Sequence, residues 1–200
     1  MSKHELVLAS GNKGKLRELK ALLEPFDFEL HTQAEFEVPD VAETGTTFVE
    51  NAIIKARNAA AHTGLPAIAD DSGIEVDALD GAPGVYSARF AGPNASDQEN
   101  NALLVQKLAD VPEQQRTARY RAVIVYMAHA ADPSPIICEG SWQGRILLQP
   151  RGQGGFGYDP YFYLPDQGCT SAELTAEQKN ALSHRGQALR LLVEKLSQLY

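Results

Sequence analysis

The chain has 200 residues, of which 44% are hydrophobic and 22% charged; this is the composition of a globular protein, which we expect to form a single domain over residues 1–200. No apolar run approaches the ~20 residues that a membrane-spanning helix needs. We find no signal-peptide pattern, and Cys138 and Cys169 match no metal or redox spacing. We therefore expect a cytoplasmic protein. The net charge of −8 argues against polymeric nucleic acid as a partner and leaves room for a small anionic ligand where cations gather.

The N-terminal half of the chain predicts strands that alternate with helices. Short apolar runs indicate strands, and apolar residues three and four positions apart indicate helices. Pro25 is expected to end the first helix. The predicted elements are, in order, a strand at residues 5–9, a helix with leucines at 16, 19, 22 and 23, a strand at 28–32, an alanine-rich helix at 47–61 and a strand at 67–69.

The C-terminal half predicts a run of strands between two helical regions. Ser96 and Glu99 have the spacing of a capping box ahead of a helix. There follow strands at residues 119–128, 136–142 and 144–148, a glycine-rich turn at 152–157, an aromatic strand at 161–164 and a helix with an apolar stripe of Leu189, Leu192, Val193, Leu196 and Leu199. Residues 183–186 interrupt the helical pattern. The two halves together predict an α/β fold with a central mixed sheet flanked by helices.

The loop after the first strand, residues 10–15, has features of a phosphate site. A glycine-broken loop that opens a helix exposes backbone N–H groups, which favour phosphate, and Asn12 is suited to cap that helix. Lys13 and Lys15 add positive charge at the same turn. The spacing of the glycines is too short for a Walker A loop. An ordinary turn with solvated lysines explains this segment equally well.

Two adjacent carboxylates, Asp70 and Asp71, follow the strand at residues 67–69. We expect them at the strand's end, and because side chains alternate along a strand, only one of them can face a given cleft. Acids at that edge of an α/β sheet suit Mg²⁺ or a general base. Taken alone, the run from Asp71 through Ser72 to Gly73 is better explained as a turn.

Two later segments carry further candidates. Residues 152–157 match G-x-G-x-x-G, but no helix can begin at residues 158–160, so we exclude a dinucleotide-binding fingerprint. An aromatic loop here suits stacking on a base, although a hairpin turn with aromatic packing is slightly the better explanation of this segment alone. Lys179, His184 and Arg185 lie in the last third of the chain, and His184 and Arg185 stand at the expected helix junction. Alone, such a pair fits a solvated helix end.

Each of these patterns is unspecific, but their order along the chain is specific. The motifs are Ser10-Gly11-Asn12-x-Gly14-Lys15, Glu43-Thr44-Gly45, Glu50-Asn51-Ala52, Asp70-Asp71-Ser72-Gly73, Gly81-Ala82-Pro83-Gly84, Phe156-Gly157-Tyr158-Asp159-Pro160 and Ser183-His184-Arg185-Gly186. In this order they resemble the inosine-triphosphate pyrophosphatase family, and most of all its bacterial dITP/XTP pyrophosphatases. The resemblance covers the chain from Ser10 to the C-terminal helix, with Ser10 where many members carry threonine.

The resemblance implies an elongated, two-lobed α/β fold with a substrate cleft between the lobes, working as a homodimer. It implies Mg²⁺-dependent hydrolysis of deaminated purine nucleoside triphosphates (dITP, ITP and XTP) to the monophosphate and pyrophosphate. Such an activity cleans the nucleotide pool and prevents misincorporation into DNA and RNA.

The resemblance also implies roles for individual residues. Asp71 is the expected catalytic residue and metal ligand, Glu43 a second carboxylate beside the metal, and Lys55 a further phosphate contact. The expected substrate-binding residues are Ser10, Gly11, Asn12, Lys13, Gly14 and Lys15 at the phosphates, Ser72 beside Asp71, Phe156, Gly157, Tyr158 and Asp159 around the base and sugar, and Lys179, His184 and Arg185 to complete the pocket.

Two other classes of function compete with this one. A non-catalytic purine nucleotide-binding or sensing module would use the same cations without activating water; the acids Asp70, Asp71 and Glu43 argue against it. An RNA-binding protein would use Phe156 and Tyr158 as stacking surfaces; the net charge of −8 argues against that function.

Overall fold

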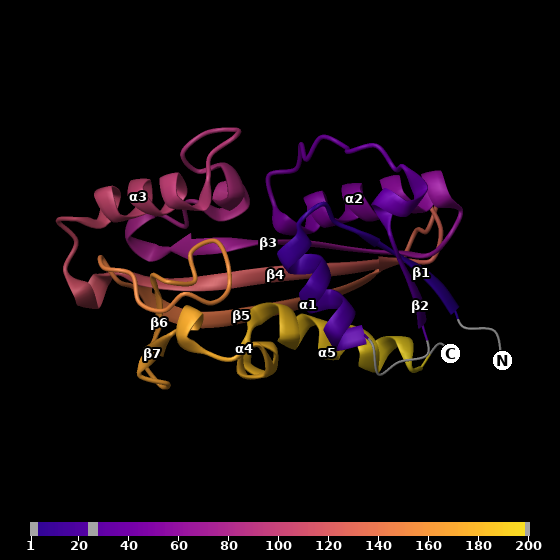
Figure 1. Cartoon of the computed structure of the whole chain (residues 1–200). Coiled ribbons are helices and arrows are strands. Elements are labelled where there is room, and N and C mark those ends of the chain that lie inside the picture. The colour runs from indigo at the N-terminus through magenta and orange to yellow at the C-terminus, as the bar shows by residue number, and fades with distance from the viewer. Residues whose placement is uncertain (1–3, 24–27, 199–200) are drawn as a thin grey trace. The chain divides into compact units, whose positions relative to one another are not determined.

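The computed structural model describes residues 4–23 and 28–198 (Figure 1). Its α-helices are α1 (Lys13–Leu23), α2 (Phe48–Thr63), α3 (Asp97–Leu108), α4 (Ala176–Leu182) and α5 (His184–Leu196). Its strands are β1 (His4–Ala9), β2 (Phe28–Thr32), β3 (Ala67–Val76), β4 (Thr117–Met127), β5 (Ile136–Ile146), β6 (Phe162–Leu164) and β7 (Cys169–Thr170). Short 3-10 helices are η1 (Gln33–Phe36), η2 (Asp77–Leu79), η3 (Gly84–Arg89), η4 (Glu113–Gln115) and η5 (Ser171–Glu173). Pro25, expected to end the first helix, and Leu199, expected in the C-terminal stripe, lie outside the described residues.

The strands form a mixed sheet in the order β2-β1-β3-β4-β5-β6-β7. β1 runs parallel to β2 and to β3, whereas β6 is antiparallel to β5 and to β7. The register pairs Leu6 with Leu30 and Leu8 with Ile68. The predicted α/β fold with a mixed sheet and helices is therefore confirmed.

The chain divides into two compact units. The first unit comprises the described parts of residues 1–71, 122–140 and 185–200, and the second comprises residues 72–121 and 141–184. β3, β4 and β5 contribute residues to both. Each unit has its own buried apolar residues. The single domain over residues 1–200 stays a prediction.

In the first unit, helices cover both faces of the strands (Figure 1). Leu6 and Leu8 of β1 pack in one buried cluster with residues of α1 and α5, and Val7 and Ala9 pack in another with residues of α2. Because successive side chains of a strand point to opposite faces, a strand covered on both sides needs the uninterrupted apolar run that β1 has. The buried α2 residues of the second cluster are all alanine: Ala52, Ala56, Ala59 and Ala60.

The core of the second unit is richer in aromatic residues. It includes Tyr120, Trp142, Tyr158 and Phe162, packed with leucines of α3. α3 begins after Ser96, whose hydroxyl accepts a hydrogen bond from the Glu99 N–H while the Glu99 carboxylate accepts one from the Ser96 N–H. The predicted capping box is therefore confirmed.

Asp70 and Asp71 do not follow the end of a strand, because β3 continues through them over Ala67–Val76. The expectation of a strand end and turn is wrong. Tertiary contacts hold this segment extended: the Ile74 N–H, for example, donates a hydrogen bond to Ser87 Oγ at 2.9 Å. The pairing of β1 with β3 ends at Ala9 and Ala69, and Ala69 is the residue before Asp70. The two aspartates are thus the first residues of β3 beyond its pairing with β1.

β5 is one continuous strand over Ile136–Ile146, instead of the two strands expected from the sequence. Gly144 lies within it. A Cβ at this position would lie 2.6 Å from the Tyr163 carbonyl oxygen and 2.7 Å from the Phe162 ring. The glycine therefore allows β6 to approach β5 more closely than any other residue would.

The helical junction near the C-terminus agrees with the sequence. α4 ends at Leu182, Ser183 is extended, and α5 begins at His184, so the predicted interruption is confirmed at Ser183, whereas residues 184–186 are already helical. Among the described residues, none of the helices combines the length and the apolar character needed to cross a membrane.

Gly144→Ala is expected to lower the free energy of unfolding by ~1–3 kcal/mol, because the added methyl group must displace the backbone of β6. Urea unfolding followed by circular dichroism measures the change. Gln143→Ala, at an exposed position of the same strand, is the control and should change the free energy by less than ~0.5 kcal/mol. Equal stability of Gly144→Ala and the wild type would contradict the close approach of β5 and β6.

Candidate functional site

Asn12 organises the loop between β1 and α1 through hydrogen bonds of its side chain. Its Oδ1 accepts hydrogen bonds from the N–H groups of Gly14 at 2.9 Å and Lys15 at 3.1 Å. Ser10 Oγ accepts one from the Asn12 N–H at 3.2 Å. Asn12 therefore caps α1, and Lys13 beside it is exposed. A helix N-terminus flanked by two lysines is a favourable environment for an anion.

Asp70 lies buried between two cations. Its Oδ2 is 3.1 Å from Lys15 Nζ and 3.5 Å from Arg185 Nε. Arg185 also contacts the carboxylate of Glu18 on α1. Burial by itself would raise the pKa of Asp70, but the charges of Lys15 and Arg185 outweigh it and hold that pKa well below its usual range. Asp70 is therefore ionised at neutral pH and ties α1 and α5 to β3.

Asp71 pairs with a different cation, because successive side chains of β3 point to opposite faces. Lys55 Nζ lies 3.1 Å from Asp71 Oδ1 and 3.5 Å from Glu43 Oε2. The other oxygen, Asp71 Oδ2, is buried and has no hydrogen-bond partner among the described residues. Burial raises the pKa of Asp71, although Lys55 opposes the shift. The pKa values of the two neighbouring carboxylates are thus shifted in opposite directions.

Asp71 and Glu43 fit a divalent cation. Mg²⁺ prefers oxygen ligands, carboxylates above all. A buried carboxylate oxygen without a donor is unfavourable unless a cation or a hydrogen bond satisfies it, and Asp71 Oδ2 is such an oxygen. Glu43 shares Lys55 with Asp71, so the two acids approach the same cation. The side chains present are therefore suited to hold Mg²⁺.

Asp159 organises a second group of side chains, all in the second unit. Its Oδ2 accepts hydrogen bonds from Lys179 Nζ at 2.8 Å and from the Phe156 N–H at 2.9 Å. Its Oδ1 accepts from Ser171 Oγ at 2.8 Å and from the Tyr120 hydroxyl at 3.3 Å. Lys179 Nζ lies 4.6 Å from the centre of the Phe156 ring, a cation–π contact. Asp159 therefore fixes both a cation and the aromatic ring beneath it.

Tyr158 lies in the core of the second unit. It is 5% exposed, and its hydroxyl donates a hydrogen bond to the Ser87 carbonyl oxygen at 2.7 Å. Burial raises the pKa of this phenol. The preceding Gly157 donates its N–H to Asp97 Oδ2 at 2.7 Å. This placement leaves Phe156, which is partly exposed, as the aromatic residue of the loop suited to stacking.

His184 begins α5 and packs against two aromatic rings. Its imidazole lies parallel to the Tyr120 ring, with 4.7 Å between ring centres and 7° between planes. The Trp142 ring lies 6.3 Å away at 22°. The histidine is 4% exposed. His184 is therefore not the solvated helix end that its motif alone would fit, because packing against two rings fixes the orientation of its imidazole.

The residues expected at the site fall into two groups, one in each unit. The first-unit group contains Ser10, Gly11, Asn12, Lys13, Gly14, Lys15, Glu43, Lys55, Asp71 and Arg185. The second-unit group contains Phe156, Gly157, Tyr158, Asp159, Lys179 and His184, and Ser72 begins this unit directly after Asp71. The first group is dominated by charge and the second by aromatic rings around one ion pair.

Sequence motifs do not point to Glu18, Tyr120 or Ser171, which contact these groups. Glu18 lies three residues after Lys15 on α1, and residues three apart share a helix face. That spacing was the available signal for Glu18. Tyr120 and Ser171 reach Asp159 from β4 and η5, 39 and 12 positions away in the chain. Only the tertiary structure brings them together.

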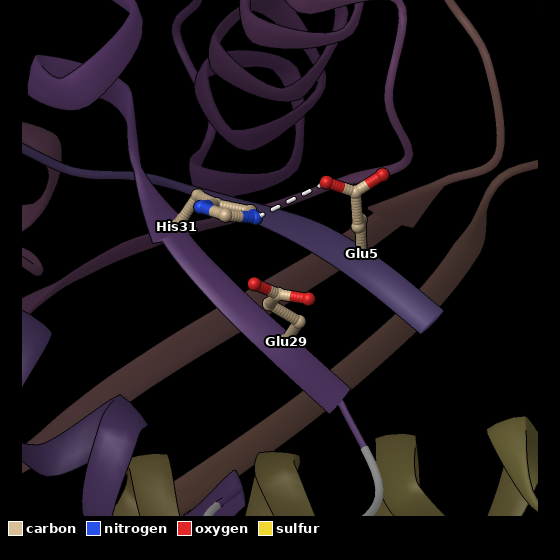
Figure 2. Close-up of side chains that lie close together, drawn as sticks. All are labelled: Glu5, Glu29 and His31. Carbon is tan, nitrogen blue, oxygen red and sulfur yellow. Dashed lines mark ion pairs between the residues drawn. The ribbon is translucent and has the colours of Figure 1, made fainter. Parts of the chain in front are cut away.

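A further cluster of metal-ligand side-chain types lies on β1 and β2 (Figure 2). His31 Nε2 is 3.4 Å from Glu5 Oε1, and Glu29 lies beside them. The second ring nitrogen of His31 is 3.4 Å from Glu35 Oε2. The side chains of Glu5 and Glu35 are 53% and 51% exposed, and exposed ion pairs contribute ~0–1 kcal/mol. We therefore interpret this cluster as surface charge pairing.

Comparison with known proteins identifies a family for this chain and several similar relatives. The Ham1 family matches residues 6–195. A dITP/XTP pyrophosphatase of Vibrio parahaemolyticus is 60% identical over 193 residues, which are 96% of each chain. A dITP/XTP pyrophosphatase of Shigella flexneri is 57% identical over 192 residues, 96% of this chain and 98% of the relative.

Solved structures agree with the fold. A HAM1 protein from Coxiella burnetii has a TM-score of 0.91 and 51% identity, over 98% of this chain and 99% of that protein. A nucleoside-triphosphatase / dITP/XTP pyrophosphatase from Mycobacterium abscessus has a TM-score of 0.75 and 44% identity, over 94% and 98% of the two chains. By its sequence over nearly its whole length and by its fold, this chain belongs to the Ham1 family, which confirms the resemblance that its motifs indicated.

Proposed function

We infer that this protein is a nucleoside-triphosphate pyrophosphatase that hydrolyses dITP and XTP, the substrates for which its relatives are named. The observation that supports this function most directly is the pair of aspartates in β3. Asp70 holds Lys15 and Arg185 in place, while Asp71 shares Lys55 with Glu43 and has a buried Oδ2 that no donor among the described residues contacts. Phosphoryl transfer needs positioning and charge neutralisation more than covalent chemistry, and this arrangement offers both.

The triphosphate is proposed to bind at the first-unit group. The backbone and side chains of the loop at residues 10–15 would contact phosphate oxygens, with the exposed Lys13 reaching outward. Lys15 and Arg185 are proposed to complete this group; Asp70 and Glu18 balance their charges, so Lys13 and the N-terminus of α1 would supply most of the attraction for phosphate. Mg²⁺ is proposed to be held by Asp71 and Glu43, and when bound it supplies charge neutralisation at the phosphates.

Asp71 is proposed to accept the proton of the attacking water. The water oxygen forms a bond to the α-phosphorus while the bond from that phosphorus to the α–β bridging oxygen breaks. Pyrophosphate leaves with the electron pair of that bond, and the nucleoside monophosphate remains. Lys55 donates a hydrogen bond to Asp71 Oδ1 at 3.1 Å and would hold the carboxylate in one orientation. The choice of the α-phosphorus rests on the family resemblance.

The base is proposed to bind at the second-unit group. Phe156 offers a stacking face, and Lys179 and His184 offer hydrogen-bond donors. Hypoxanthine and xanthine present an acceptor oxygen at C6, whereas adenine presents a donor amine, so such donors favour the deaminated bases. Ser72 and Gly157 complete the proposed contacts, with Tyr158 and Asp159 in supporting positions.

Several finer features stay predictions from the resemblance. They are the homodimer, the elongated two-lobed shape with a substrate cleft, and the cytoplasmic location. In the cell the reaction would remove deaminated nucleotides before a polymerase incorporates them. A non-catalytic nucleotide-binding module would bind the same nucleotides and release no pyrophosphate.

A panel of five nucleotides tests the proposed function. We expect kcat/KM for ITP, dITP and XTP to exceed that for ATP and GTP by ~10²-fold or more, because a mismatched buried polar group discriminates far better than a missing methylene. Adenine would mismatch at C6, and guanine at its C2 amine. Pyrophosphate release with Mg²⁺ and with EDTA is the measurement.

Each result of the panel has a separate meaning. Nucleotide binding without pyrophosphate release would favour the non-catalytic module. Similar rates for ITP and ATP would contradict the C6 argument, and similar rates for ITP and GTP would contradict the C2 argument. Undiminished activity in EDTA would contradict the proposed Mg²⁺ site.

Asp71→Asn is expected to reduce kcat by at least ~10²–10⁴-fold, because the amide accepts no proton, and loss of metal affinity should add to the effect. The amide keeps the shape of the carboxylate, and Lys55 keeps Glu43 as an ion-pair partner, so in a urea titration the variant should unfold close to the wild-type midpoint. Turnover within a few-fold of the wild type would rule out the proposed role.

Asp70→Asn should behave differently in the same urea titration. It removes the carboxylate between Lys15 and Arg185, and breaking a buried ion pair costs ~3–5 kcal/mol. Because the pKa of Asp70 is lowered in the folded protein, its contribution is complete above the ordinary aspartate pKa of about 4. The difference from the wild type should therefore be full at pH 7 and shrink toward pH 3. A constant difference across this range would be inconsistent with the ion pair.

A further inference from the structure

We propose that Tyr120 is a positioning residue that sets the selectivity of the base site. It would do so by fixing His184 through its ring and Lys179 through its hydroxyl. This inference rests on the proposed function, since the base is taken to bind at Phe156, Lys179 and His184. No motif contains Tyr120, and its placement in the second unit is the starting observation.

The ring of Tyr120 fixes the plane of the His184 imidazole. The two rings are stacked, with 4.7 Å between centres and 7° between planes. Tyr120 itself is held edge-on by Phe162, with 4.5 Å between ring centres and 62° between planes. It is 8% exposed, so the stacked rings are largely shielded from solvent. Removal of the aromatic ring would leave His184 with a different packing surface and its ring nitrogens pointing in a different direction.

The hydroxyl of Tyr120 acts on Lys179 through Asp159. It donates to Asp159 Oδ1 at 3.3 Å, and Ser171 Oγ donates to the same oxygen at 2.8 Å. With one oxygen held in this way, the other points toward Lys179 Nζ at 2.8 Å. Rotation of the carboxylate would shift the ammonium, which lies 4.6 Å from the centre of the Phe156 ring. The hydroxyl therefore helps to set where the ammonium lies above the ring.

The placement of the donors on His184 and Lys179 affects selectivity between bases more than it affects the hydrolysis step. A donor discriminates a C6 oxygen from a C6 amine only if it points at that atom, because a displaced donor can bind water instead. The reacting phosphorus is proposed to lie at Asp71, which belongs to the other unit. A change at Tyr120 should thus raise KM for ITP and narrow the difference between ITP and ATP, while kcat for ITP stays near the wild-type value.

Two substitutions separate the ring from the hydroxyl. Tyr120→Phe keeps the stack and removes the hydrogen bond, and should lower the ratio of kcat/KM for ITP to that for ATP by about threefold to tenfold. Tyr120→Leu removes both and should lower the ratio by more than about tenfold. Tyr126→Phe is the control, because Tyr126 is also a buried tyrosine of β4 but lies in the first-unit core; its ratio should equal that of the wild type.

A double-mutant cycle tests whether the hydroxyl acts through the ammonium. In a Lys179→Met background, Tyr120→Phe should change the ITP-to-ATP ratio by less than about twofold, because the group that it positions is gone. Independent effects of the two substitutions would overturn the proposed connection. Thermal unfolding of every variant accompanies the kinetics, since Tyr120→Phe is conservative and is expected to fold.

The outcomes are distinct. An unchanged ratio in Tyr120→Phe, or an equal loss of activity on ITP and ATP in both variants, would overturn the proposal and leave Tyr120 a core residue. If Tyr120→Leu does not fold, the Phe variant and the cycle decide alone. Failure of the wild type itself to prefer ITP or to release pyrophosphate would instead overturn the proposed function, and this inference with it.

Discussion

Burial of two consecutive carboxylates in one strand is the constraint on which the first unit depends. A buried carboxylate must be matched by a cation or lose its charge. The cations that match Asp70 and Asp71 come from α1, α2 and α5, in the form of Lys15, Lys55 and Arg185. Each ion pair therefore ties a different helix to β3 just beyond the end of β1. The loop that opens α1 is placed by the same requirement.

Because side chains alternate along a strand, Asp70 and Asp71 have different roles. Asp70 pairs with Lys15 and Arg185 and has a lowered pKa, whereas Asp71 shares Lys55 with Glu43 and has a raised pKa. The first is therefore suited to holding structure together, and the second to binding a cation or a proton. One residue of offset in the sequence separates stability from chemistry, because it exchanges one face of the sheet for the other.

Much of the fold could be predicted from local patterns, since capping boxes and apolar runs act over a few residues. The capping box at Ser96 and the helix junction at Ser183 are examples. The strand through Asp70 and Asp71 was missed because tertiary hydrogen bonds override a local preference for turns. Tyr158, expected around the base, is buried, and its hydroxyl reaches the Ser87 carbonyl oxygen 71 positions away, a contact that local spacing does not reveal. The partners of Asp159 come from distant parts of the chain, so no spacing in the sequence reveals them.

The alanines of α2 bear on the reach of a charge. Ala52, Ala56, Ala59 and Ala60 form the buried surface by which this helix lies against the strands, and Lys55 extends from the same helix to Asp71. Small side chains bring the helix axis close to the sheet, and the length of a lysine is fixed. A bulkier residue in place of Ala56 would act as a spacer that lifts the helix and draws the ammonium away from its carboxylate. The distance between the Lys55 ammonium and the Asp71 carboxylate is thus set in part by the volume of the uncharged alanine side chains of α2.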